Sequence, residues 1–161
     1  MIDNRKLKVY LDTSVVSYLM QVDAPDETKI TLRLWEKFKT GIYDIYLSQV
    51  DFTEMDKCEE PKLSFLKSKL NEIDYEILEI KDSTQKLATE IINMGILTNK
   101  SFDDCTHIAV AIENECDIIV SWNFKHTVNI KTINGIRAIT LLKNQKNINI
   151  LNPLTLLEME E

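Results

Sequence analysis

Three acidic residues, Asp12, Glu54 and Asp104, are placed so that they could form a site for a divalent cation. Asp12 directly follows a strand-like run at residues 7–11, Glu54 lies in the first turns of one helix, and Asp104 opens another. Carboxylates that converge raise one another's pKa unless a cation neutralises them. An all-oxygen ligand set suits Mg²⁺ or Mn²⁺ better than zinc. Such an ion can activate water and stabilise a phosphodiester transition state.

Each of these positions also has an ordinary structural interpretation. Asp12 is a good N-cap for the helix that follows it, and Glu54 is typical of a solvated helix surface. The run Ser101-Phe102-Asp103-Asp104 matches a capping box. Asn123 suits a polar turn. Only these residues taken together indicate a metal site, and the structural alternatives stay open at this point.

Short β-rich runs alternate with amphipathic helical runs along the chain. We expect strands near residues 7–11, 44–47, 76–80, 117–121 and 148–151. We expect the longer helices near 26–40, 83–94, 101–114 and 132–146, with shorter ones after Asp12, Ser48 and Pro61. This order predicts an α/β fold with a central, mainly parallel twisted sheet of four to five strands and helices on both faces. No linker is visible, so one domain over residues 1–161 is expected.

In open parallel sheets the working site lies beyond the carboxyl ends of the strands. Asp12, Ser48 and Ser121 each lie at or just past the end of an expected strand. This rule therefore places the candidate site at the edge of the sheet where these residues meet.

Length and composition limit the class of protein. The chain has 161 residues, 44% of them apolar and 28% charged, which suits one domain with a real core and excludes disordered classes. Its net charge of −7 excludes a globally basic nucleic-acid binder, although not a local basic face. Three cysteines, with no CxxC spacing, fit neither a disulfide framework nor a zinc ribbon. No apolar run nears the ~18 residues of a membrane helix, and the N-terminus lacks the apolar region of a signal peptide. We therefore expect a cytoplasmic protein without membrane association.

Charge is unevenly distributed along the chain. No Asp or Glu occurs between Ile118 and Leu157, and this stretch carries five cations: Lys125, Lys131, Arg137, Lys143 and Lys146. The pattern predicts a basic face from Lys125 to Lys146 along which a phosphate backbone could approach. Candidate RNA contacts are Lys100, Lys125, His126, Lys131 and Arg137. Chance segregation on a solvated helix is the alternative.

Four strings in this order and spacing, KVYLDTSVVSYL, LSQVDFTEM, KSFDDCTHIAVA and CDIIVSWNFKH, closely resemble the PIN domain nucleases. Among these the chain looks most like the VapC-type ribonuclease toxins of toxin–antitoxin pairs. The resemblance runs from the first strand to NPLTLLE near the C-terminus. It implies a PIN-like fold and a metal-dependent endoribonuclease that hydrolyses RNA phosphodiester bonds. It also implies an antitoxin protein as partner and a homodimer.

The resemblance assigns roles to particular residues. It implies that Asp12, Glu54 and Asp104 bind Mg²⁺ or Mn²⁺, and that Thr13, Ser14 and Ser121 support them through hydrogen bonds. Asn123 stands where the family often has a further Asp, and it enters the expected catalytic set without that charge. A two-metal mechanism is therefore less secure. One compromise is a single ion held by Asp12 and Asp104, with Glu54 acting through water.

Other interpretations compete with this one. A degenerate PIN module that binds RNA or a protein without cleavage is supported mainly by Asn123. Phosphoryl transfer at Asp12, as in haloacid dehalogenase-like domains, lacks the second acid of a DxD pair because Thr13 and Ser14 follow. His107 fits a hydrogen-bonded helix histidine better than a metal ligand. Trp122 and Phe124 are candidates for base stacking, although aromatic residues beside a buried strand are more often core.

Overall fold

The computed structural model describes residues 5–160. Five strands are present in this part of the chain: β1 (Leu7–Leu11), β2 (Tyr43–Ser48), β3 (Tyr75–Leu78), β4 (Ile118–Val120) and β5 (Asn149–Leu151). The helices are α1 (Thr13–Ser17), η1 (Tyr18–Met20), α2 (Pro25–Lys39), α3 (Gln49–Met55), α4 (Lys62–Leu70), α5 (Asp82–Asn93), η2 (Asn99–Ser101), α6 (Phe102–Glu113), α7 (Ile130–Leu142) and α8 (Pro153–Met159).

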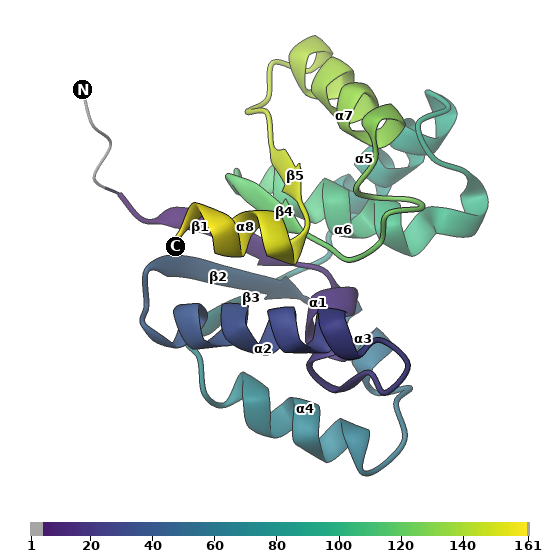
Figure 1. The fold of residues 1–161 in the computed structure, drawn as a ribbon. Coiled ribbons are helices and arrows are strands. Elements are labelled where there is room, and N and C mark those ends of the chain that lie inside the picture. Colours follow the sequence, from purple (N-terminus) through teal and green to yellow (C-terminus); the bar gives the residue numbers. More distant parts are fainter. Residues whose placement is uncertain (1–4, 161) are drawn as a thin grey trace.

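The strands form one sheet in the order β3-β2-β1-β4-β5, and every pairing is parallel. Because the strand order reverses at β1, the crevice between β1 and β4 is the switch point of the sheet. Figure 1 shows helices on both faces, with α2 and α4 on one side and α5, α6 and α7 on the other. The predicted α/β fold with a five-stranded parallel sheet is confirmed.

Alternate residues of the central strands feed two separate cores. Val9 and Leu11 of β1 pack in the cluster that also contains Leu34 and Trp35 of α2. Tyr10, between them, points into the other cluster, which is built mainly from α5, α6 and α7. This alternation follows from the period of two residues along a strand. Both faces of β1 are buried, as expected for a central parallel strand.

The observed elements differ from the expected ones mainly at the C-terminus. No helix was expected after residue 151, whereas the structure contains α8 over Pro153–Met159. Asn152 caps this helix by accepting from the backbone N–H of Thr155, and Pro153 occupies its first turn. An N-cap Asn followed by Pro is a recognised signal for the start of a helix. The local sequence therefore contains the reason for this helix.

Gly135 is required inside α7 because this helix packs closely against the loop after α5. A Cβ at position 135 would lie 2.6 Å from Cγ1 of Ile96, whose side chain is buried. In an exposed helix, alanine would be favoured over glycine by about 1 kcal/mol. We expect Gly135→Ala instead to lower the free energy of unfolding by about 1–2 kcal/mol, because overpacking outweighs propensity. Urea denaturation measures this change. In an Ile96→Ala background, the same substitution should become neutral or stabilising; a stabilised single variant would contradict the prediction.

Among the described residues, no helix has both the length and the apolar character needed to cross a membrane.

Candidate active site

Residues from four elements line one cleft at the carboxyl edge of the sheet. Its walls include Asp12 beside β1, Glu54 of α3, Asp104 and His107 of α6, and Asn123 after β4. The cleft has a volume of about 290 Å³. The structure therefore brings together the acids that lie far apart in the sequence, at the edge where the topology places a site. Their binding of a metal ion stays a prediction.

Asp12 is both a helix cap and part of the cleft wall. Its carboxylate accepts from the backbone N–H of Ser14, at 3.1 Å, and from the Ser14 hydroxyl. Burial raises the pKa of Asp12, and His107 and the hydroxyl of Ser121 oppose that rise. The Ser14 hydroxyl also accepts from the backbone N–H of Trp122, at 2.8 Å. Ser14 therefore ties the loop after β4 to Asp12.

Asp104 is not used in a capping box. Ser101 makes no side-chain cap of α6, and its hydroxyl is buried without a hydrogen-bond partner in the structure. Instead, Oδ1 of Asp104 accepts from the amide nitrogen of Asn123 at 3.3 Å. Burial and the nearby charge of Asp12 raise the pKa of Asp104. The two acids therefore repel each other across the cleft.

Glu54 is held by two donors on a single oxygen. Oε1 lies 2.8 Å from the Thr13 hydroxyl, which donates to it, and 2.7 Å from Nε2 of His107. Although burial works in the opposite direction, the hydrogen bonds and charge of His107 together with Thr13 lower the pKa of Glu54. The ionised form of Glu54 is thus favoured, and Thr13 and His107 compensate its negative charge.

Asn123 presents its nitrogen, not its oxygen, to the acids. Its Nδ2 donates to Asp104, while Oδ1 accepts from the backbone N–H of His126 at 3.0 Å. In this arrangement Asn123 compensates the charge of Asp104 and shapes the loop. The catalytic role expected of Asn123 stays a prediction.

Asp51, a buried acid behind the cleft, was not among the residues expected at the site. Asp51 is 3% exposed and accepts from the backbone N–H of Ser48 at 2.9 Å, while Ser48 caps α3 in return. Burial raises the pKa of Asp51 to about 7. The run Ser48-Gln49-Val50-Asp51 has the spacing of a capping box, and this signal could have identified it.

His107 is the hydrogen-bonded helix histidine that the sequence favoured. Burial alone lowers its pKa, but Asp51, Glu54 and Asp12 together raise the pKa of His107 to about 9. The neighbouring acids therefore favour the protonated form of His107, which would place a positive charge between them.

The donor chemistry of the cleft fits Mg²⁺ or Mn²⁺ held by two carboxylates. Within residues 5–160, no three Asp, Glu, His or Cys side chains are gathered closely enough to hold an ion. The carboxylate of Glu54 is bound to Thr13 and His107. Mg²⁺ usually keeps several waters and takes only one or two carboxylates from a protein. Asp12 and Asp104, whose repulsion a cation would relieve, meet that requirement.

Two of the five cations in the predicted basic face from Lys125 to Lys146 are paired with acids. Lys146 binds Asp117, which precedes β4 and so lies at the opposite edge of the sheet from the cleft. Lys143 forms an ion pair with Glu90 at 2.9 Å. Acids remote in sequence therefore compensate the charge of these two cations.

The five candidate RNA contacts lie on several elements. Lys100 is exposed in η2, Lys125 is exposed in the loop after β4, and Lys131 and Arg137 are exposed on α7. His126 is half-buried in the same loop, and its backbone N–H donates to Asn123 in the wall of the cleft. The structure therefore places His126 beside the cleft.

The two aromatic residues after β4 have different environments. Trp122 is buried, stacks on Tyr18 with ring centroids 5.9 Å apart, and donates from Nε1 to Thr31. Phe124 is 52% exposed. Trp122 is therefore core, and only Phe124 of the two could stack on a base.

The parallel sheet, its strand order and the acidic cleft at its carboxyl edge define a PIN-like α/β fold. The fold is similar to that of a chain in the crystal structure of VapBC2 from Rickettsia felis bound to a DNA fragment from their promoter. The TM-score is 0.54 and the sequence identity 17%, over 91% of this chain and 98% of that chain. No family model matches the sequence, and no curated protein does. The likeness supports the PIN-like fold that the four motifs predicted.

Proposed function

We propose that the protein is a Mg²⁺- or Mn²⁺-dependent endoribonuclease, the toxin of a toxin–antitoxin pair. The observation that carries the proposal is the convergence of Asp12, Glu54 and Asp104 on one cleft at the switch point of a PIN-like sheet. Asp12 and Asp104 are kept close against their mutual repulsion, which is the arrangement a divalent cation stabilises.

In this proposal each residue has a limited task. Asp12 and Asp104 hold the ion, and Ser14 and Ser121 keep the Asp12 carboxylate oriented and ionised. Asn123 orients Asp104 by donating to its Oδ1. Glu54 faces the same cleft with one oxygen bound to Thr13 and His107. When bound, a divalent cation acidifies water and stabilises negative charge on a phosphate.

The direct test is cleavage of single-stranded RNA by the purified chain. We expect cleavage with Mn²⁺ or Mg²⁺ and none when EDTA removes the ion, because the ion would supply the activated water and the positive charge at the phosphate. Cleavage that persists in EDTA would contradict the proposed metal dependence.

A binding module without cleavage is the second candidate, and the orientation of Asn123 favours it. Its amide already compensates the charge of Asp104, which weakens the need for a cation. Retention of RNA without any cleavage, whatever the metal, would support this alternative.

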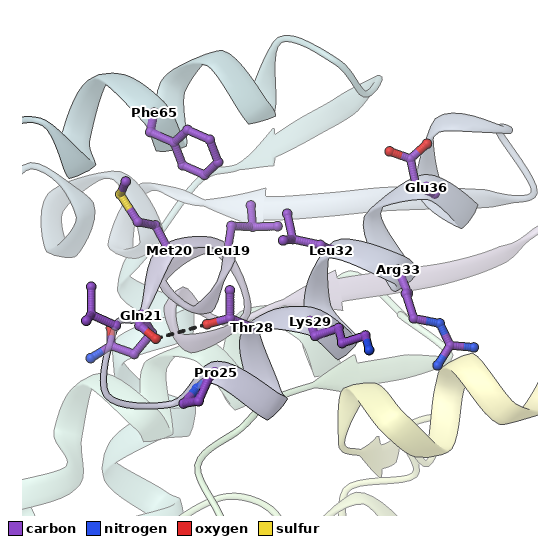
Figure 2. Close-up of a pocket in the computed structure, with 11 residues that line it drawn as sticks. Leu19, Met20, Gln21, Pro25, Thr28, Lys29, Leu32, Arg33, Glu36 and Phe65 are labelled. Atoms are coloured by element: carbon purple, nitrogen blue, oxygen red, sulfur yellow. Dashed lines mark hydrogen bonds between the residues drawn. The ribbon is translucent and has the colours of Figure 1, made fainter.

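The proposal includes a protein partner, and an apolar groove offers a place for one. Helices η1, α2 and α4 enclose a groove of about 710 Å³. Figure 2 shows Phe65 of α4 across from Leu19 and Leu32. Val22, at its rim, is 94% exposed. Grooves of this kind suit the apolar face of an amphipathic helix.

We propose that such a helix belongs to an antitoxin, the product of a short gene adjacent to this one. Co-expression of the two products, followed by co-purification, tests the partner. A homodimer is also proposed, and light scattering of the purified chain measures it. We also propose that RNA is the substrate and that the protein acts in the cytoplasm.

A further inference from the structure

His107 connects the buried core to the wall of the cleft. Its side chain is 3% exposed, and its two ring nitrogens face different partners. Nε2 lies 2.7 Å from Oε1 of Glu54, at the cleft, and Nδ1 lies 2.5 Å from the hydroxyl of Tyr10, in the core. Rotation of the ring would break both contacts, so the imidazole has one orientation.

Tyr10 fixes that orientation from behind. It is fully buried on β1, and its hydroxyl lies 2.8 Å from Oγ of Ser48 and 3.2 Å from Oδ2 of Asp51. Both of these groups belong to the rigid capping box at the start of α3. The capping box at the start of α3 therefore holds Tyr10 in place, and Tyr10 contacts His107. His107 in turn holds Glu54, which lies on the same helix.

The contacts of Glu54 show what this arrangement does. Thr13 and His107 both bind the same oxygen, Oε1. Asp12 and Asp104 line the same cleft, but their hydrogen bonds come from uncharged groups: Ser14 donates to Asp12, and Asn123 donates to Asp104. Of these three carboxylates, Glu54 is the one hydrogen-bonded to a histidine, and the His107 ring competes with a cation for its Oε1.

We infer that His107 is a positioning residue that holds Glu54 away from the ion at Asp12 and Asp104. Glu54 is thereby kept for the substrate side of the cleft instead of serving as a ligand. This inference rests on the proposed function, because it assumes that an ion binds there. It makes a counterintuitive prediction: removal of His107 strengthens metal binding and weakens catalysis.

The test compares His107→Leu with the wild-type chain. We expect Mn²⁺ to bind about threefold to tenfold more tightly, because the freed Glu54 adds a charged ligand. We expect kcat on single-stranded RNA to fall by about tenfold or more, as for other residues that orient a metal site. Calorimetric titration of the metal-free protein measures the first effect, and cleavage of labelled RNA measures the second.

Two further variants separate positioning from a structural role. His107→Gln keeps an N–H that can reach Glu54, and it should return Mn²⁺ affinity and part of kcat towards wild type. Glu54→Gln should abolish the gain, so His107→Leu with Glu54→Gln binds Mn²⁺ no more tightly than Glu54→Gln alone. If His107→Leu does not fold, Tyr10→Phe takes its place, because it removes only the hydroxyl behind His107. It should raise Mn²⁺ affinity and lower kcat, as expected for His107→Leu.

The outcomes distinguish this inference from the proposal beneath it. Unchanged or weaker Mn²⁺ binding by His107→Leu, with a wild-type chain that binds Mn²⁺ and cleaves RNA, overturns the positioning role alone. A wild-type chain that binds no Mn²⁺ overturns the proposed metal site itself.

Discussion

We expect Asp12→Asn and Asp104→Asn each to reduce the proposed RNA cleavage by about a thousandfold, because loss of either carboxylate would remove several kcal/mol of metal-dependent stabilisation and each 1.4 kcal/mol is tenfold in rate. We expect neither change to disturb the fold. Asparagine caps a helix as well as aspartate does, so the side chain introduced by Asp12→Asn still accepts from the backbone N–H of Ser14 in α1. Initial rates on labelled single-stranded RNA with Mn²⁺, at equal folded protein, measure the loss.

The adjacent acid Asp103 provides a matched control for this experiment. Asp103 is exposed and precedes Asp104 in the first turn of α6. Asp103→Asn removes the same charge from the same turn, and we expect rates within about twofold of wild type, as for most surface substitutions. Equal cleavage by all variants would identify a contaminating nuclease and remove the support for the assigned site.

We expect Asp117→Asn to lower the free energy of unfolding by about 2–3 kcal/mol at pH 7, because it weakens hydrogen bonds to a charged group. Asp117 accepts from both terminal nitrogens of Arg5 at 2.7 Å and from the backbone N–H of Lys8 at 2.8 Å. Lys146 binds the same carboxylate. One nearly buried acid thus joins the start of β1, the start of β4 and the segment before β5.

The difference in free energy of unfolding between wild type and Asp117→Asn depends on pH in a defined direction. Arg5 and Lys146 hold the pKa of Asp117 well below its ordinary value, although burial by itself would raise that pKa. A carboxylate with a lowered pKa in the folded state stabilises the protein above its unfolded pKa of about 4 and loses that contribution as the pH falls. The gap between wild type and Asp117→Asn should therefore be constant from pH 6 to 8 and shrink below about pH 4.

Urea denaturation across this pH range measures the effect. Asp44→Asn is the control, because Asp44 is exposed on β2. We expect it to change stability by less than about 0.5 kcal/mol at any pH. A gap for Asp117→Asn that grows in acid would contradict the prediction.

Much of the fold could be predicted because its signals are local. The strand at Leu7–Leu11 and the amphipathic α2 are indicated by the periodicity of neighbouring residues. Their alternation leads to a parallel sheet, and the sheet places Asp12, Glu54 and Asp104 near one edge. The convergence of these acids therefore followed from topology before any distance was known.

Hydrogen-bond partners could not be predicted in the same way. The Ser101 run had the spacing of a capping box, yet no cap forms and Asp104 faces the cleft. The basic stretch after Lys125 was continuous in sequence, yet Lys146 turns to Asp117. In both cases spacing along the chain described what was possible, and competition among groups in space decided what formed.

The amino-acid sequence by itself determined the order of strands and helices, and with it the edge of the sheet at which the acids gather, because both depend on contacts between near neighbours. Only the tertiary structure decided how those acids are compensated. Tyr10 meets His107 across 97 positions, and His107 meets Glu54 across 53. Such contacts depend on how buried polar groups satisfy one another once water is excluded, and no local pattern encodes that pairing.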